Sequence, residues 1–498
     1  MATNSDGSLP FDHVVVLMLE NRSFDNLLGY LYEEGAPQRF VGRGEPAFRG
    51  VAGRSDLWNE DDATPANRYA VGKAPFATPV DMCHPCPDPG EFYKPHVNCQ
   101  LYGIDDAPAD VRLLPDPAPM SGFVRDYVRA VRAQFLLDGV EPTPDRVRVI
   151  MNCFTPEALP VISGLAREFA VSDEWFCSVP SQTYCNRSFF HSAQSHGFVT
   201  NSDYLKWRHN TAPTIFERLT GALGAGHDWR VYWDRQDLMP LTRFIHPQLL
   251  HARWDANFRE FDAFAGDCAA GDLPAYSFIQ PRLVFNHNDM HPPVALNPEV
   301  HSSTLAGEQL IAAVYDAVRT SPKWPRTLLV ITFDEHGGCY DHWPPPLGAA
   351  PPDPIPAYEL QDGFRFDRFG VRVPTIFVSP HVAPGTVVRA SGGTPFDHTS
   401  MIRTLSQRWE LEPLTGRDRA APDFSAVFTL GEREARLDTP TLTPRPYTPI
   451  SSSDAGETPL SGMQQEFASL VAHHLGSGLA GAVTKVRDFR RLAEGRRS

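Results

Sequence analysis

The stretch His13-Val14-Val15-Val16-Leu17-Met18-Leu19 is followed at once by Glu20-Asn21-Arg22-Ser23. A run that is so apolar and so rich in β-branched side chains predicts a central strand buried on both faces. Open α/β sheets bind their ligands outside the carboxyl ends of such strands. Glu20 and Asn21 come at that end, and both offer the oxygen atoms that hard divalent cations prefer.

A helix cap is the alternative interpretation of these polar residues. A Glu-Asn pair after a strand more often belongs to a cap or a loop than to a metal site. Ser23 or Asp25 can cap a following helix by accepting a hydrogen bond from its first turn. A second cluster of matching chemistry is therefore needed before Glu20 and Asn21 are interpreted as ligands.

That second cluster follows another apolar run, Thr327–Phe333, and reads Asp334-Glu335-His336-Gly337-Gly338. Two strands of one sheet that deliver Glu20/Asn21 and Asp334/Glu335 to the same edge would build a site of four oxygen ligands. Three carboxylates so close together repel one another unless a cation lies between them. The two glycines permit a tight turn just beyond the ligands. The sequence therefore predicts a site for one divalent cation, with Ca, Mg, Mn and Zn all open.

Composition bounds the class of protein. The chain has 498 residues, of which 42% are hydrophobic and 21% charged, so most of it can pack a core. A net charge of −15 argues against a general nucleic-acid binder, which needs clustered Lys and Arg. We expect no signal peptide in residues 1–8 and no transmembrane helix, so we expect a cytoplasmic protein; the oligomeric state stays open.

Eight cysteines are scattered through the chain, and we expect free thiols rather than a disulfide framework. Cys83-His84-Pro85-Cys86 has a spacing known from zinc sites, but no second pair of this kind follows. A zinc site there is the minor alternative.

Helical and apolar extended segments alternate along the chain, which predicts an α/β fold with a mostly parallel central sheet and helices on both faces. We assign residues 1–430 to one catalytic domain. Residues 36–120, rich in Pro, Gly and Asp, form an irregular lid-like insertion in this assignment. Residues 431–498 form a helical extension packed on the domain, with helices at about 459–475 and 479–495. The other expected elements are helices at 121–137, 158–169 and 305–319, and strands at 170–172, 327–333 and 373–378.

Three further segments carry candidate chemistry. Thr183 lies where the loop Pro180–Gln182 leads into a helix, and a hydroxyl at a helix start can act as a nucleophile. Asp289, His291 and His301 bring a carboxylate and imidazoles for acid/base work. In Asp397-His398-Thr399-Ser400, a helix cap explains the Asp as well as catalysis does.

Together these motifs resemble the bacterial phospholipase C and acid phosphatase family of phosphoesterases, a branch of the alkaline-phosphatase superfamily. The matching segments appear in the family's order: His13–Asp25, Thr183 with Asn186-Arg187, Asp289 with His291-Pro292, Trp324–His342 and Asp397–Ser400. The resemblance implies an alkaline-phosphatase-like fold and hydrolysis of a small phosphoester or a phospholipid head group.

The resemblance also implies roles for the residues. The metal would be held by Glu20, Asn21, Asp334 and Glu335, and the oxygen of the nucleophile, Thr183, would complete its shell. His291 and His301 would contact the phosphoryl group or protonate the leaving oxygen, and Thr183 would carry a phospho-threonine intermediate.

This chain departs from the family pattern at three places. The family's Asp-Pro-x-His is here Asp88-Pro89-Gly90-Glu91, with His96 five residues after Glu91, so we take His96 as the candidate. Tyr184-Cys185 replaces the common Asn-Pro after the nucleophile. Met290 stands where a second Asp is usual, and Asp289 would take over its contact.

These departures leave the substrate open. A phospholipase C-type phosphodiesterase is the favoured interpretation, and an acid phosphatase-type monoesterase acting on a soluble metabolite is its rival. A sulfatase is disfavoured because no modified Cys or Ser motif is present. A catalytically silent relative that binds a phosphorylated ligand is the alternative from another class.

Overall fold

The computed structural model describes residues 9–78, 80–202, 204–237, 239–283, 286–293, 302–353 and 360–447. The candidate His301 and the two helices expected beyond residue 458 lie outside these ranges.

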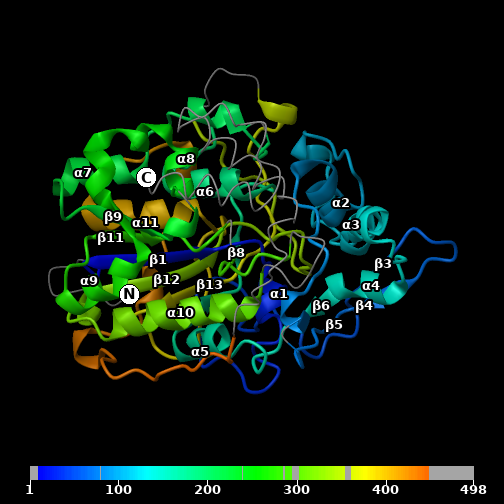
Figure 1. Cartoon of the computed structure of the whole chain (residues 1–498), viewed down its shortest axis with the longest axis horizontal. Coiled ribbons are helices and arrows are strands. Elements are labelled where there is room, and N and C mark those ends of the chain that lie inside the picture. Colours follow the sequence, from blue (N-terminus) through cyan, green and yellow to red (C-terminus); the bar gives the residue numbers. More distant parts are fainter. Residues whose placement is uncertain are drawn as a thin grey trace, which may run out of the picture.

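A nine-stranded sheet forms the centre of the molecule (Figure 1). Every neighbouring pair is parallel except the two pairs made by β13, which runs antiparallel to β12 and β7. The predicted α/β class with a mostly parallel sheet is confirmed. In spatial order the strands are β10 (Phe258–Glu260), β9 (Trp229–Trp233), β11 (Tyr276–Ile279), β1 (His13–Leu19), β12 (Thr327–Phe333), β13 (Thr375–Val378), β7 (Ala170–Ser172), β14 (Thr386–Val388) and β2 (Arg39–Val41).

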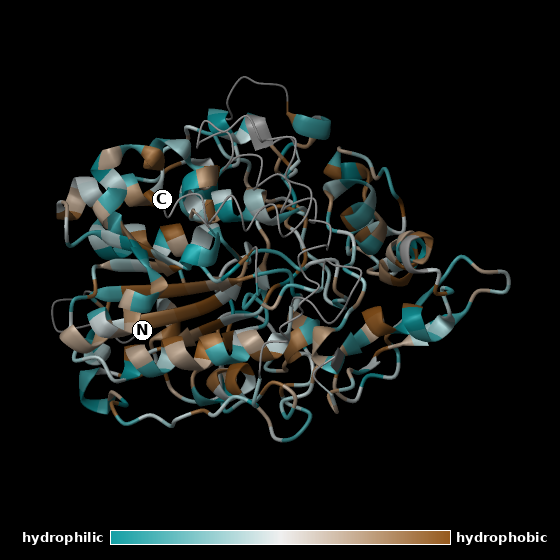
Figure 2. Cartoon of the chain, in the orientation of Figure 1, coloured by the Kyte–Doolittle hydropathy of each residue, from teal (hydrophilic) through white to brown (hydrophobic). Residues whose placement is uncertain are grey.

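Helices cover both faces of this sheet, as the sequence predicted (Figure 1). One face carries α6 (Thr183–Ser192), α7 (Ile215–Leu223), α8 (Leu241–Ile245) and α11 (Thr399–Trp409). The other face carries α5 (Pro160–Glu168), α9 (Phe264–Ala270) and α10 (Thr304–Arg319). The strands between them are hydrophobic in Figure 2, and all of β12 is buried. A strand covered on both faces must be apolar throughout, which explains the unbroken hydrophobic runs of β1 and β12.

Residues 36–120 follow α1 (Phe24–Leu28). Within this segment, β2 is the strand that joins the nine-stranded sheet. Much of the rest gathers at one end of the molecule, on the side where β1 leads into α1 (Figure 1). Its elements there are β3 (Trp58–Glu60), β4 (Arg68–Ala70), β5 (Gly72–Lys73) and α2 (Asn98–Tyr102). They pack with elements that follow residue 120, namely α3 (Phe123–Asp138), α4 (Pro144–Arg148) and β6 (Asn152–Cys153). This segment therefore lies beside the carboxyl edge of the strands.

The remaining short elements are β8 (Trp175–Phe176), β15 (Phe396–Asp397) and α12 (Gly416–Ala420). Residues 431–447 run past α10, where the Tyr315 hydroxyl donates to the carbonyl oxygen of Pro440 (2.9 Å). No helix in the described part of the chain is long and apolar enough to cross a membrane. Cys99, Cys153, Cys177, Cys185, Cys268 and Cys339 are free thiols, as expected.

Candidate active site and metal centre

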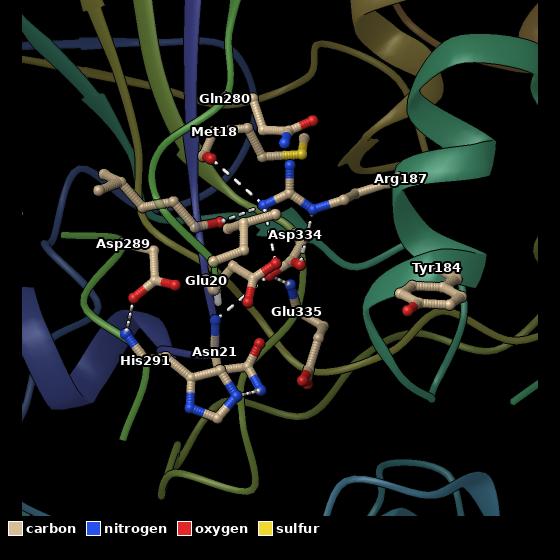
Figure 3. A network of polar contacts seen from close by, with 12 residues as sticks. Met18, Glu20, Asn21, Tyr184, Arg187, Gln280, Asp289, His291, Asp334 and Glu335 are labelled. Carbon is tan, nitrogen blue, oxygen red and sulfur yellow. Dashed lines mark hydrogen bonds and ion pairs between the residues drawn. The ribbon is translucent and has the colours of Figure 1, made fainter. Parts of the chain in front are cut away.

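The parallel register of β1 and β12 pairs Leu19 with Phe333, so the two polar clusters leave the sheet side by side. Their backbones then interlock. The amide of Asn21 donates to Asp334 Oδ1 (3.2 Å), and the amide of Arg22 donates to the Glu335 carbonyl oxygen (3.1 Å). The side chains of Glu20, Asn21, Asp334 and Glu335 are fully buried, and the structure brings all four together at one edge of the sheet (Figure 3).

Two tight turns make this approach possible. Asn21 has a φ of 60°, in the left-handed region that Asn tolerates better than most residues. Gly337 has a φ of 61°, and a Cβ atom there would lie 2.2 Å from the carbonyl oxygen of Asn21. Only glycine fits so close a contact between the two ligand-bearing turns.

Helix α6 contributes the predicted nucleophile. Thr183 is its first residue, and Arg187 follows four residues later, so the two side chains share one face of the helix. Arg187 forms ion pairs with Glu20 Oε1 (3.1 Å) and Asp334 Oδ2 (3.1 Å), and its guanidinium points into the cluster in Figure 3. The face of α6 that carries Thr183 therefore looks toward the carboxylates.

The donor atoms of this cluster fit a hard cation. Among the described residues of the predicted ligand set, five buried oxygens make no hydrogen bond: Glu20 Oε1, Glu20 Oε2, Asn21 Oδ1, Thr183 Oγ1 and Glu335 Oε1. Of these, Glu20 Oε1 forms the ion pair with Arg187. Buried polar atoms are almost always hydrogen-bonded, because leaving one unpaired costs free energy. Oxygen atoms of this kind are the ligands that a hard divalent cation prefers. Asp334, the fifth residue of the predicted ligand set, contacts Arg187 and two backbone amides.

The electrostatics of the carboxylates also favour a bound cation. Burial and the charge of Asp334 raise the pKa of Glu20 and of Glu335. Burial also raises the pKa of Asp334, although Arg187 opposes this shift. Arg187 alone does not balance three buried carboxylates, so a bound cation would stabilise their ionised forms.

The chain after β11 brings Asp289 and His291 to the same edge. The Asp289 carbonyl oxygen accepts the amide of Glu20 (2.8 Å), and His291 Nε2 lies 2.9 Å from Asn21 Nδ2. His287 donates through Nδ1 to Asp289 Oδ2 (2.8 Å). Burial lowers the pKa of His291 to about 4, so its imidazole is neutral at pH 7.

The structure does not place His96 in the cluster. Its Nδ1 lies 2.9 Å from Asp126 Oδ1, and its side chain is 22% exposed. Glu91 is the residue of this segment that enters the site, because its Oε2 accepts from Asn21 Nδ2 (2.5 Å). Burial and the charge of Glu335 raise the pKa of Glu91.

Other residues of the motifs lie outside the cluster and form hydrogen bonds with the backbone around it. Asp397 accepts the Thr399 amide and pairs with Arg417, so the capping interpretation fits its contacts. His398 Nε2 lies 2.5 Å from the carbonyl oxygen of Asp334. Ser23 caps α1 by accepting from the Asn26 amide (3.2 Å). These contacts fix the backbone on which the ligand residues stand.

A second buried network lies behind the ligand turns. Arg372 bridges Asp25 Oδ1 (3.0 Å) and Asp341 Oδ1 (2.9 Å), and His342 Nδ1 contacts Asp25 Oδ2 (2.5 Å). This network gives a structural role to Asp25, at the end of the first motif, and to Asp341 and His342, at the end of the second. Its contacts connect α1 to the loop after β12.

Two groups of three carboxylate or imidazole side chains converge to within 4.8 Å in the described part of the chain. They are Asp25 with Asp341 and His342, and Asp88 with Glu91 and His291. The carboxylates of the predicted ligand set, Glu20, Asp334 and Glu335, do not form one of these groups. Among the described residues, neither group contains Cys83 or Cys86, the residues of the zinc alternative.

The two substituted positions of the family pattern have apolar surroundings. Tyr184 packs against Trp207 (5.6 Å between ring centroids) and Phe244 (5.3 Å) in a separate apolar cluster. Met290 is fully buried in the main core beside Gly307 of α10.

Sequence reasoning missed three residues of the cluster: Arg187, His287 and Glu91. Arg187 was visible as part of the Asn186-Arg187 motif, and His287 stands two residues before Asp289. Glu91 had a weaker signal, since it occupies the place of the family's histidine. The contacts of Arg187 and Glu91 depend on segments that are distant in the sequence.

Comparison with known proteins assigns the family. The profile of the Phosphoesterase family matches residues 11–412. Non-specific phospholipase C5 of Arabidopsis thaliana is 33% identical over 490 residues, which cover 95% of this chain and 84% of the relative. Phospholipase C B of Mycobacterium tuberculosis is 24% identical over 481 residues, which cover 88% and 82%.

Among solved structures, a protein in the alkaline phosphatase superfamily from Vibrio parahaemolyticus aligns with a TM-score of 0.32 and 11% identity. The alignment covers 53% of this chain and 64% of the Vibrio protein. The match of the family profile over most of the chain, together with the identity to the plant relative, confirms the family predicted from the motifs. The chain belongs to the Phosphoesterase family and is a hydrolase of phosphoester bonds.

Proposed function

We propose that this chain is a phospholipase C-type phosphodiesterase that uses one divalent cation and forms a phospho-threonine on Thr183. The observation that carries the proposal is that buried oxygens of four residues, Glu20, Asn21, Thr183 and Glu335, make no hydrogen bond with described residues. They belong to the residues that the motifs predicted as ligands. The names of the plant and mycobacterial relatives support a diester substrate such as a phospholipid.

Glu20, Asn21, Asp334, Glu335 and the hydroxyl of Thr183 would hold the cation. When bound, it would lower the pKa of the hydroxyl and shield the negative charge of the phosphoryl oxygens. Oxygen ligands suit Ca, Mg or Mn best, and Zn also accepts carboxylates.

The residues of the chain then have distinct tasks. The Thr183 oxygen forms a bond to phosphorus while the bond from phosphorus to the leaving oxygen breaks. His291 borders the cluster through its contact with Asn21. In this proposal its neutral imidazole takes up the proton of the Thr183 hydroxyl and passes it to the leaving alkoxide. Water then hydrolyses the phospho-threonine and restores the hydroxyl. Arg187 neutralises part of the charge of Glu20 and Asp334, so an anionic phosphoryl group can approach.

The test compares p-nitrophenyl diester and monoester substrates with wild type, Thr183→Ala and Thr183→Ser, each with and without a chelator. We expect diester hydrolysis that requires the metal, is abolished in Thr183→Ala and is partly retained in Thr183→Ser, which keeps a hydroxyl. Mass spectrometry of the denatured, rapidly quenched enzyme should locate phosphate on the peptide that contains Thr183.

Activity that survives both the Thr183→Ala substitution and metal removal would overturn the mechanism. Faster hydrolysis of the monoester would favour the acid phosphatase interpretation. Absence of hydrolysis of either ester by the metal-loaded protein would favour a phospho-ligand-binding relative. The proposal includes the cytoplasmic location expected from the sequence, which cell fractionation checks.

A further inference from the structure

The carboxylate of Glu91 lies between the turn that carries a predicted metal ligand and the start of the nucleophile helix. Its Oε2 accepts from Asn21 Nδ2 (2.5 Å), and its Oε1 accepts from Gln182 Nε2 (2.9 Å). Gln182 directly precedes Thr183 and occupies the N-cap position of α6. Segments 70 and 91 residues away in the sequence thus meet on one side chain.

The first bond determines which way the Asn21 amide faces. In its ionised form Glu91 only accepts hydrogen bonds, so the side of the amide that faces this carboxylate is then the NH₂ group. That nitrogen also lies 2.9 Å from His291 Nε2. With its nitrogen held by two partners, Asn21 presents Oδ1 on the other side, where it is buried and makes no hydrogen bond with described residues. This is the orientation that a metal ligand requires.

The second bond acts on the start of α6. Gln182 Oε1 accepts from the Asn201 amide (3.0 Å), and Asn201 Oδ1 accepts from the Tyr184 amide (2.8 Å). The residues on both sides of Thr183 are therefore held by one network, and Glu91 joins that network to the turn after β1.

We propose that Glu91 is a positioning residue that turns the Asn21 oxygen toward the cation and keeps Thr183 at a fixed distance from it. This inference rests on the proposed function, because it assumes that Asn21 and Thr183 share one metal centre. Residues that orient metal ligands through hydrogen bonds usually contribute about 10- to 100-fold to metal affinity or activity. Glu91 does this through two hydrogen bonds that a smaller or apolar side chain cannot make.

The test measures Mn²⁺ affinity by titration calorimetry of the full chain, stripped of metal with a chelator. We expect Glu91→Ala to bind Mn²⁺ about 10- to 100-fold more weakly than wild type. Glu91→Gln should lose less, because its amide keeps one acceptor. The double variant Glu91→Gln/Gln182→Glu exchanges the two side chains, so that a donor again faces an acceptor in both bonds. It should recover the affinity of wild type to within a few-fold.

Asp88→Asn is the matched control for the loss of a neighbouring carboxyl group. Asp88 lies 3.9 Å from His291 Nδ1, and among described residues it makes no hydrogen bond to Asn21 or Gln182. Its substitution removes one nearby carboxyl group and should weaken Mn²⁺ binding less than Glu91→Ala does. Thermal unfolding of the metal-free variants checks that each one folds. If Glu91→Ala does not fold, the Mn²⁺ affinities of Glu91→Gln and of the double variant test the inference.

Three outcomes overturn the inference: Glu91→Ala and Glu91→Gln bind Mn²⁺ as wild type does, Asp88→Asn loses as much affinity as Glu91→Ala, or the exchanged pair is no better than Glu91→Gln. In each case a wild type with metal-dependent diesterase activity leaves the proposed function standing. A wild type that binds no divalent cation overturns both.

Discussion

Leu19 of β1 lies opposite Phe333 of β12 in a parallel register, and each residue is the last of its strand. Glu20 and Asp334 therefore leave the sheet at the same level. Arg187 reaches both of their carboxylates at 3.1 Å. A register shift of one residue would point one of the two side chains to the other face of the sheet, so the site depends on this pairing.

Metal binding should stabilise the fold through these carboxylates. A ligand that binds only the folded state at 100 times its dissociation constant adds about 2.7 kcal/mol of stability. We expect Mn²⁺ to raise the thermal midpoint of wild type and a chelator to reverse the increase, with the increase lost in Asp334→Asn. Differential scanning calorimetry measures it. Glu60→Gln, which changes an exposed carboxylate paired with Arg68, is the control and should respond as wild type.

Arg187 should contribute most to thermal stability when no metal is bound. Removing one partner of a buried ion pair typically costs about 3–5 kcal/mol, because the other charge is left uncompensated. Arg187→Ala should therefore unfold at a lower temperature than wild type in chelator, and added Mn²⁺ should narrow the difference by neutralising Glu20 and Asp334. Arg187→Lys keeps the charge but has one nitrogen, so it should fall between the two. Equal midpoints for Arg187→Ala and wild type in chelator would contradict this account.

Gly337 should be irreplaceable for a local steric reason. Gly337→Ala would place a Cβ atom 2.2 Å from the Asn21 carbonyl oxygen and push the two ligand turns apart. A misplacement of about 1 Å can cost on the order of 100-fold in rate, which is the loss of kcat/KM that we expect.

Gly348→Ala provides the control for backbone strain. Gly348 also has a positive φ, 83°, but no atom lies within 4 Å of its Cβ position. Its substitution adds left-handed strain of about 1–2 kcal/mol without the clash and should leave kcat/KM near wild type. Similar losses of activity in the two variants would show that strain, not the contact with Asn21, is decisive.

Glu308 should give the stability a recognisable pH dependence. Its carboxylate accepts the amides of Val161 (2.7 Å) and Ile162 (2.8 Å) at the start of α5. Burial raises its pKa from 4.5 to about 7, although the two amides oppose the shift. The folded state therefore prefers the protonated form, so this contribution to stability is complete below about pH 4.5 and is lost as the pH rises to about 7.

Glu308→Gln removes this titration while keeping the shape of the side chain. The stability of wild type relative to the variant should therefore fall by about 3 kcal/mol between pH 4.5 and 7. Thermal midpoints of both proteins at several pH values in this range measure the difference. A pH-independent difference would contradict the raised pKa.

Strands and their polar ends were predictable because their signals are local. The apolar runs before Glu20 and before Asp334 each correspond to a strand of the expected length, and α10 begins within one residue of its predicted start. The expected strand at 373–378 is shorter in the structure, at Thr375–Val378, and its antiparallel direction had no signal in its own residues.

The sequence by itself determined the fold class, the family and the identity of the residues with ligand chemistry, since these depend on residue type and short spacing. Only the tertiary structure decided that Glu91 rather than His96 contacts Asn21, and that Arg187 reaches Glu20 and Asp334. Glu20 and Asn21 alone could be explained as part of a helix cap, and the pairing of β1 with β12 places them beside Asp334 and Glu335. The reason is physical: contacts between segments far apart in the chain depend on how the whole core packs, and no local pattern specifies that packing.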